Sequence, residues 1–167
     1  MHTESPEAKN REAETAGQER RPNRLWRLIR KFINVSVAPF VPLNSLRIWL
    51  YRRVGYSIGK SVFVGMMCYL DDTRPERMVI EDEVVISYRV TFICHGPGVP
   101  FDGKIILRRN CYLGAASTLV SPVEIGESAT VGAGAVVVKN VPELTTVVGV
   151  PARVIRQGVP PWGQERD

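Results

Sequence analysis

A six-residue apolar period in the second half of the chain constrains the fold more than any other feature. Aliphatic residues occupy every sixth position, without a gap, at Leu107, Leu113, Leu119, Ile125, Val131 and Val137. An α-helix would give a period of 3.6 and a half-buried strand a period of 2. A period of six indicates that each unit is a short strand followed by a corner, so that one phase of the repeat always points into a narrow prism.

The same spacing extends upstream and is interrupted by insertions at 71–78 and 93–106. The upstream inward positions are Ile58, Val64, Leu70, Ile80, Ile86 and Phe92. If three strands make one turn of a triangular prism, the twelve hexads form about four turns. Glycine follows the inward residue at several corners, as at Gly65 and Gly114, where a residue without Cβ suits a tight corner. Successive turns then pair as parallel ladders, and the segment 141–157 is expected to cover the last open edge.

Charge and composition divide the chain into four parts. Residues 1–22 carry four basic and five acidic residues and almost no large apolar ones, which predicts a disordered tail and excludes a signal peptide. Residues 23–56 carry seven basic residues and no acidic one. The repeat occupies 57–142, and 143–167 form a C-terminal cover and tail. The three cysteines have no paired spacing, so the sequence indicates neither a disulfide framework nor a zinc motif and favours a cytoplasmic location.

Two short amphipathic helices are predicted within 23–56. Apolar residues recur at helical spacing from Leu25 to Ile33 and again from Leu46 to Val54, on either side of a break that contains two prolines. The favoured interpretation is a helical cap packed on the main domain. The alternative is a peripheral membrane anchor, because basic side chains lie beside Trp and Phe residues. The longest apolar stretch is too short, and too broken by proline, to span a bilayer.

From about Pro42 to Arg156 the chain resembles the hexapeptide-repeat acyltransferases, in particular the galactoside, maltose and glycan O-acetyltransferases. The motifs that carry this resemblance are IGKSVFVG, VGAGAVVVKNVP and VVGVPARVIR. The resemblance implies an all-β, left-handed parallel β-helix that assembles as a homotrimer. It also implies that acetyl-CoA lies in the groove between two neighbouring prisms, so that each active site is shared by two chains.

Acyl transfer to a hydroxyl requires a base that removes the hydroxyl proton, and histidine is the usual choice near neutral pH. The chain has two histidines: His2, in the predicted tail, and His95, in the loop FICHGPGVPFDG. His95 is the candidate general base. Asp71 and Asp72 in the first insertion, and Asp102 on the His95 loop, are the candidate carboxylates to orient it. The resemblance also aligns Asp71 with a polar residue that contacts the acceptor sugar, so two roles are open for this residue.

The resemblance further implies which residues contact acetyl-CoA. A backbone N–H at Ala115 would donate to the thioester oxygen as that oxygen gains negative charge, and cationic side chains would meet the nucleotide phosphates. The residues in matching places are Ala115, Ala133, Val138, Lys139, Arg153 and Arg156. No metal is implied. Arg108 and Arg109 are unexpected at a corner and have two interpretations, contact with an anionic acceptor or simple solvation.

These features predict an acetyl-CoA-dependent O-acetyltransferase that acts on a sugar or polysaccharide-precursor hydroxyl by direct transfer in a ternary complex. Two alternatives are N-acetylation of an amino sugar and a catalytically silent trimeric scaffold. An acyl-enzyme at Cys94 is disfavoured because adjacent residues of an extended chain point in opposite directions. A zinc carbonic anhydrase would need three histidine ligands, and the basic segment lacks a nucleic-acid recognition motif.

Overall fold

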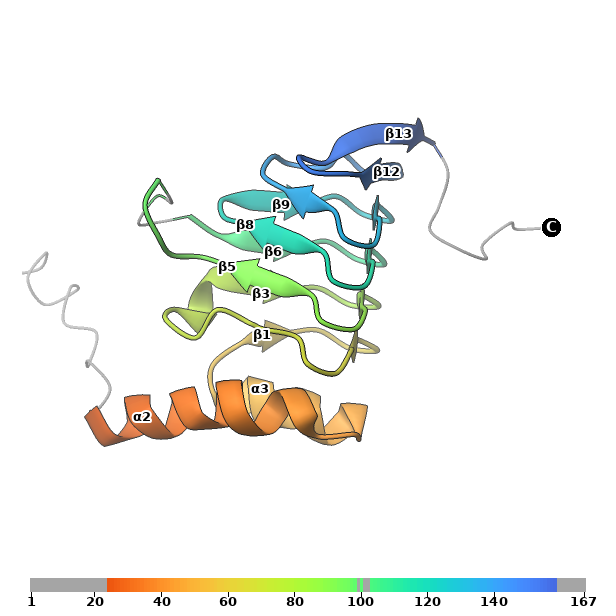
Figure 1. Ribbon diagram of the computed structural model, residues 1–167. Helices are drawn as coiled ribbons and strands as arrows, with labels where there is room; N and C mark the ends of the chain where they lie inside the picture. The colour runs from red at the N-terminus through yellow and green to blue at the C-terminus, as the bar shows by residue number, and fades with distance from the viewer. Residues whose placement is uncertain (1–23, 99, 101–102, 159–167) are drawn as a thin grey trace, which may run out of the picture.

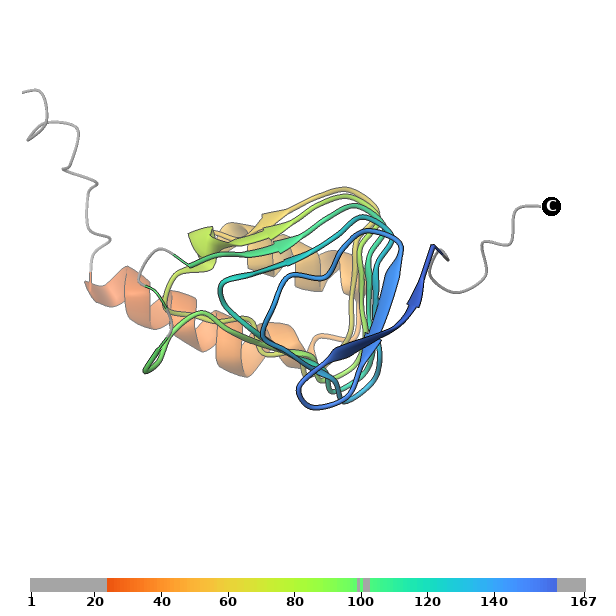
Figure 2. The same cartoon turned by 90° about the horizontal axis from the view of Figure 1, so that it is seen from above.

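Short parallel strands stack into a three-sided prism, with two helices lying across one end (Figures 1 and 2). The computed structural model describes residues 24–98, 100 and 103–158. The elements before the prism are α2 (Arg24–Phe32), the π-helical turn η1 (Ile33–Val37), the 3-10 turn η2 (Ala38–Phe40) and α3 (Asn44–Arg53). A further 3-10 turn, η3 (Pro75–Arg77), lies in the first insertion.

Three sheets form the sides of the prism. The first sheet consists of β1 (Ser57–Ile58), β3 (Met78–Ile80), β6 (Ile105–Leu107) and β9 (Val123–Ile125). The second consists of β2 (Phe63–Val64), β4 (Val85–Ile86), β7 (Tyr112–Leu113), β10 (Thr130–Val131), β12 (Thr145–Val148) and β13 (Arg153–Gln157). The third consists of β5 (Thr91–Ile93), β8 (Thr118–Val120) and β11 (Val136–Val137).

The inward residues of the repeat stack in columns along the prism axis. In the first sheet, Ile80 pairs with Ile58 on one side and with Leu107 on the other, and Leu107 pairs with Ile125. Each inward residue therefore pairs with the residue three hexads along, across both insertions. These side chains are buried or nearly so and form the core. The positions of the inward aliphatic residues in the sequence thus determine which residues pair between successive turns.

The corners account for the six-residue period. In the first and second sheets, the third residue after the inward one repeatedly adopts a positive φ, as at Asn110 (56°) and Ala116 (57°), which turns the chain sharply within a few residues. The glycine that directly follows the inward residue has a different purpose. A Cβ on Gly114 would lie 2.4 Å from the backbone nitrogen of Ala133 in the next turn, so close stacking excludes a side chain there.

Polar side chains of α3 close the first turn, whose strand edges would otherwise leave backbone groups unpaired. The amide of Asn44 donates to the Val62 carbonyl at 3.0 Å and accepts from the Val64 N–H at 3.0 Å. The buried guanidinium of Arg47 donates to the Val64 carbonyl, and Arg52 donates to a carbonyl of β1 at 3.1 Å. α3 therefore caps the prism through these hydrogen bonds and through Ile48 and Tyr51, which are buried in the hydrophobic core. Among the described residues, no helix combines the length and apolar character needed to cross a membrane.

At the opposite end of the prism, the second sheet ends in a reversed strand. The parallel ladder continues past residue 142, because Val131 pairs with Val147 of β12. β13 then runs antiparallel along β12, with Val148 opposite Arg153. Figure 1 shows this pair at the end of the molecule away from the helices.

Candidate active site

The two insertions of the repeat leave the prism at the same corner. Tyr69, just before the first insertion, pairs with Thr91 of β5, just before the second. The residues that follow each of them are therefore neighbours, and His95 Nδ1 lies 2.5 Å from Asp71 Oδ2. The structure thus brings together two of the predicted site residues, although 24 positions separate them in the sequence.

The Asp71 carboxylate is completely buried, with 0% of the residue exposed. Its Oδ1 accepts hydrogen bonds from the backbone N–H and the hydroxyl of Thr73, at 2.9 and 2.5 Å, and its Oδ2 accepts one from the Cys94 N–H at 2.6 Å. Burial by itself would raise the pKa of Asp71, but the hydrogen bonds from Thr73, His95 and Cys94 outweigh it and hold the pKa below its ordinary value. The carboxylate is therefore negatively charged near neutral pH.

The His95 imidazole is half-exposed, with 53% of its side chain accessible. A carboxylate partner at Nδ1 favours the tautomer that carries its proton on Nδ1, which leaves a lone pair on Nε2. Nε2 makes no hydrogen bond to any described residue. The arrangement can therefore take a proton from a bound hydroxyl and use Asp71 to stabilise the imidazolium that forms.

Two side chains that sequence reasoning missed hold the Asp71 main chain in place. The hydroxyl of Tyr56 donates to the carbonyls of Leu70 and Asp71, at 3.1 and 2.9 Å. Asn34 is buried beneath the same loop and donates to the Leu70 carbonyl at 2.7 Å. A signal for Asn34 was present in the sequence, because a lone amide inside an otherwise apolar stretch requires a polar partner.

Asp72 and Asp102 stand apart from this pair. The Asp72 carboxylate accepts a hydrogen bond from the Tyr69 hydroxyl at 3.0 Å and lies 3.8 Å from Lys31 Nζ, so it does not contact His95. Of the two adjacent carboxylates in the first insertion, Asp71 is the one bonded to the imidazole. Asp102 lies outside the described residues.

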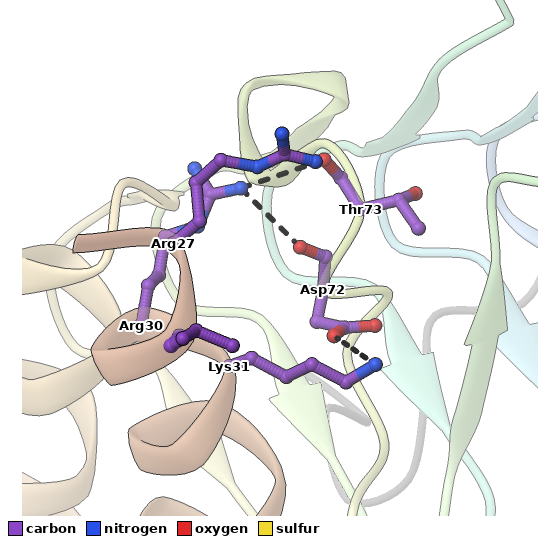
Figure 3. Close-up of a pocket in the computed structure, with 6 residues that line it drawn as sticks. Arg27, Arg30, Lys31, Asp72 and Thr73 are labelled. Atoms are coloured by element: carbon purple, nitrogen blue, oxygen red, sulfur yellow. Dashed lines mark hydrogen bonds and ion pairs between the residues drawn. The ribbon is translucent and has the colours of Figure 1, made fainter. Parts of the chain in front are cut away.

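A cationic cavity of about 510 Å³ opens beside the Asp71 loop (Figure 3). Its lining residues are Arg27, Leu28, Arg30, Lys31, Asp72 and Thr73. Arg30 donates to the main-chain carbonyls of Asp72 and Thr73, at 3.4 and 3.5 Å, and thereby attaches α2 to the loop. Because Thr73 also bonds Asp71, the cavity wall continues directly into the pair with His95.

The Cys94 thiol is buried and is not activated. Burial, and secondly the negative charge of Asp71, raise its pKa to about 12. A thiol with so high a pKa carries almost no thiolate near neutral pH, so it is a poor nucleophile. The Cys94 carbonyl accepts a hydrogen bond from the buried Arg77 guanidinium at 3.3 Å, which fixes the start of the His95 loop. The chemistry of Cys94 thus argues against an acyl-thiol intermediate.

The residues expected to contact acetyl-CoA lie on the surface at corners and on β13. Ala115 and Ala133 occupy the corner between the second and third sheets in successive turns, where the Ala115 carbonyl accepts from the Gly134 N–H at 2.8 Å. The Ala115 N–H makes no hydrogen bond within the described residues, which suits a donor to a ligand. The exposed members of the set are Ala133, Val138, Lys139, Arg153 and Arg156.

One chain does not bring His95 and Ala115 together. Ala115 precedes the third-sheet strand β8, whereas His95 follows β5, its hydrogen-bonded neighbour in the same sheet. The two residues therefore lie at opposite edges of that sheet, about 10 Å or more apart for strands of three residues. This placement agrees with a site completed by a neighbouring chain.

Arg108 is occupied by partners within its own chain. Its guanidinium bonds Glu124 Oε1 at 2.6 Å and Glu81 Oε1 at 2.8 Å, and these two carboxylates raise the pKa of the guanidinium. The backbone N–H of Arg109 donates to the other oxygen of Glu81 at 2.9 Å. Arg108 therefore links successive turns. Because its charge is already paired with two carboxylates, it is unsuited to binding an anionic acceptor.

Comparison with known proteins assigns the family. No family model matches the chain. It is 30% identical over 132 residues to the Bacillus subtilis (strain 168) protein YvoF, named as an acetyltransferase, and the match covers 77% of each protein. The chain belongs to the hexapeptide-repeat acetyltransferase family. Several serine acetyltransferases match over about a third to a half of their own length.

Two of these acetyltransferases differ in their acceptors. Galactoside O-acetyltransferase of Escherichia coli (strain K12) is 28% identical over 122 residues, which cover 65% of this chain and 60% of the relative. A serine acetyltransferase structure in complex with cysteine superposes with a TM-score of 0.56 at 26% identity, over 80% of this chain. The present chain spans 52% of that structure, about half its length. Both relatives are named as acetyltransferases, and their names specify different acceptors, a galactoside and serine.

Proposed function

We propose that this acetyltransferase transfers the acetyl group of acetyl-CoA to a hydroxyl of a sugar or polysaccharide precursor, with His95 as general base and Asp71 as the residue that orients it. The single observation that carries the proposal is the short contact between a buried, negatively charged carboxylate and a half-exposed imidazole. An imidazole that is bonded to a buried carboxylate and remains accessible to solvent has the geometry that general-base catalysis requires.

The proposed reaction is a direct transfer in a ternary complex. The acceptor oxygen attacks the thioester carbonyl carbon while His95 Nε2 takes the hydroxyl proton, and Asp71 stabilises the resulting imidazolium. The carbonyl oxygen becomes negatively charged in the tetrahedral intermediate, and the free N–H of Ala115 from a neighbouring chain is the proposed donor to it. The carbon–sulfur bond then breaks, and His95 returns its proton to the departing CoA thiolate.

The donor is proposed to lie between two chains of a homotrimer. The small side chains of Ala115 and Ala133 leave space for the pantetheine arm along the prism. Lys139, Arg153 and Arg156 are exposed cations at the same end of the molecule, where they can pair with the nucleotide phosphates. The separation of His95 from Ala115 within one chain supports this arrangement, because a second chain is needed to complete the site.

A second candidate acceptor is the hydroxyl of serine. Serine acetyltransferases are recurrent among the relatives, including the superposed structure described above. The reaction at His95 would be unchanged, since serine also offers a hydroxyl. N-acetylation of an amino sugar would use the same base and donor, so only the product distinguishes the three acceptors.

The test is a measurement of CoA release from acetyl-CoA with separate galactoside, oligosaccharide, glucosamine and L-serine acceptors, followed by mass spectrometry of each product. His95→Ala is expected to lower kcat by about 10²- to 10⁴-fold with the best acceptor. His2→Ala, at the other histidine of the chain, is the matched control and is expected to leave kcat unchanged. Equal turnover by His95→Ala and wild type would refute the proposed base. Absence of turnover by the wild type with every acceptor would favour the scaffold.

A further inference from the structure

The helix α2 lies on the prism with its polar side facing inward. Arg30 donates to two carbonyls of the first insertion, Lys31 lies 3.8 Å from the Asp72 carboxylate, and Asn34 in the following turn is buried against the Leu70 carbonyl. Positions 30, 31 and 34 share one helical face. The contacts between this helix and the prism are therefore hydrogen bonds and an ion pair, in contrast to the usual apolar packing of a surface helix.

The apolar side of α2 consequently faces away from the prism. Phe32 is 62% exposed on this side, and Leu28, which also borders the cavity beside Asp71, is 67% exposed. α3 continues this surface: its prism-facing residues include Arg47 and Ile48, while Leu46 and Trp49 on its other side are exposed. We call this set the basal surface, and its members are Leu25, Leu28, Ile29, Phe32, Leu46 and Trp49. An exposed group of large apolar side chains on this scale normally marks a binding surface.

Positive charge borders the basal surface at Arg53, whereas other basic residues of the same segment, such as Arg30 and Arg47, face the prism. Residues 23–56 hold seven basic residues and no acidic one. The guanidinium of Arg53 lies 5.1 Å above the ring of Trp49, at the border of the apolar surface. An apolar surface that carries tryptophan, is bordered by arginine and lacks carboxylates in its own segment is complementary to an anionic lipid headgroup layer.

Two other occupants fit less well. Residues 1–22 contain no large apolar residue besides Met1, so this segment lacks the side chains to cover the basal surface. A neighbouring prism is also poorly placed to cover it, because α2 and α3 lie across the end of the prism (Figure 1). In a trimer of side-by-side prisms, the three basal surfaces would face the same way and remain accessible.

We propose that the basal surface docks this acetyltransferase on an anionic membrane surface. α2 and α3 would lie flat in the headgroup region, with their apolar side chains directed toward the acyl chains. The prism would stand on the membrane, and three copies in one trimer would bind with increased avidity. Because the polar side of α2 lines the cavity beside Asp71, docking would hold the candidate active site near the lipid headgroups.

The test uses the full-length protein and sedimentation with vesicles. Vesicles of phosphatidylcholine alone and of phosphatidylcholine mixed with phosphatidylglycerol are compared at low and high salt. The wild type is expected to bind the mixed vesicles more strongly, and to lose part of this binding at high salt. The double variant Leu28→Glu with Phe32→Glu is expected to weaken binding by about tenfold or more, because it removes two apolar anchors and adds negative charge.

The matched control is Ile155→Glu, which changes a 62% exposed apolar residue on β13 at the other end of the prism. This control is expected to bind vesicles as the wild type does. Far-ultraviolet circular dichroism and thermal melting establish that all variants are folded. Failure of the wild type to bind anionic vesicles, or equal binding by the double variant, would overturn the proposal. A double variant that changes the oligomeric state in light scattering, together with a wild type that does not bind vesicles, would instead assign the surface to a protein contact.

Discussion

Replacing Asp71 with asparagine separates the orienting role of this carboxylate from its place in the fold. The side chain is buried and accepts hydrogen bonds from Thr73 through Oδ1 and from Cys94 and His95 through Oδ2. Asparagine preserves the shape but replaces one of these oxygens with an NH₂ donor. If Oδ1 keeps its two donors, the new amide faces His95 Nδ1 and donates to it, which moves the imidazole proton to Nε2.

The expected effect follows from this change of tautomer. An imidazole protonated on Nε2 cannot accept the proton of the acceptor hydroxyl. Disrupting the equivalent carboxylate in a histidine–aspartate pair of a hydrolase lowers kcat by about 10⁴-fold. We expect a loss of about 10³- to 10⁴-fold in Asp71→Asn, which corresponds to about 4 to 5 kcal/mol of activation free energy.

The assay is the steady-state release of CoA at saturating acetyl-CoA and acceptor. The KM for acetyl-CoA is expected to stay close to that of the wild type, because the residues proposed to bind it lie elsewhere. Asp72→Asn is the matched control, since it changes the adjacent carboxylate, which contacts Tyr69 and Lys31 but not His95. Its kcat is expected to remain within about fivefold of the wild type. A kcat for Asp71→Asn as high as that of Asp72→Asn would refute the proposed role of the pair.

Three further predictions concern stability and reactivity. Gly114→Ala is expected to lower the free energy of unfolding, measured by urea denaturation, by about 3 kcal/mol, because its Cβ would lie 2.4 Å from the Ala133 nitrogen. Gly134→Ala is the control: its Cβ would lie in open space, and the φ of 68° alone is expected to cost about 1 kcal/mol. The pKa of Asp71 is lower in the folded than in the unfolded state, so its carboxylate stabilises the fold above its unfolded pKa of about 4, and this stabilisation is lost as the pH falls through the folded-state pKa. The free energy of unfolding of Asp71→Asn should therefore depend less on pH in this range than that of the wild type. Cys94→Ala is expected to retain turnover, and iodoacetamide to leave the folded wild type active, because the Cys94 thiol is buried with a pKa of about 12; loss of turnover on either treatment would support an acyl-thiol route.

The prism could be predicted from the sequence because its period is a property of the backbone path. Every turn repeats the same strands and corners, so residues such as Leu107 and Ile125 must share one column. The insertions were equally informative, since a break in a strict repeat leaves the prism and exposes its residues to ligands. This reasoning located His95 and the first insertion without any structural information.

The choice between Asp71 and Asp72 could not be made from the sequence. Both carboxylates lie in the same insertion, and adjacent side chains of an extended chain point in opposite directions. Which of them meets His95 depends on the path of the loop, and that path is fixed by Tyr56 and Asn34 from an unrelated part of the sequence. The pairing of Arg108 with Glu81 was hidden for a similar reason, because the second insertion lies between these two residues in the sequence.

The orientation of α2 was also beyond sequence reasoning. The apolar period identifies two faces of the helix but does not state which one packs on the prism. The structure shows the polar face of α2 against the prism and its apolar face exposed. Asn34 donates to the Leu70 carbonyl, and Arg30 donates to carbonyls of the first insertion, so polar side chains of this segment satisfy backbone acceptors there. The contacts of α2 with the prism are therefore polar, whereas α3 also buries Ile48 and Tyr51 against it.

The reversed strand β13 interrupts the parallel growth of the second sheet. A prism of parallel turns can in principle grow without end, because each turn leaves the same open edge for the next, including a turn from another copy. β13 runs against this direction, and its residues are exposed. The edge that it presents does not continue the parallel ladder in register. Within the described residues, the second sheet therefore ends in a strand that a further parallel turn, including one from another copy, cannot extend in register.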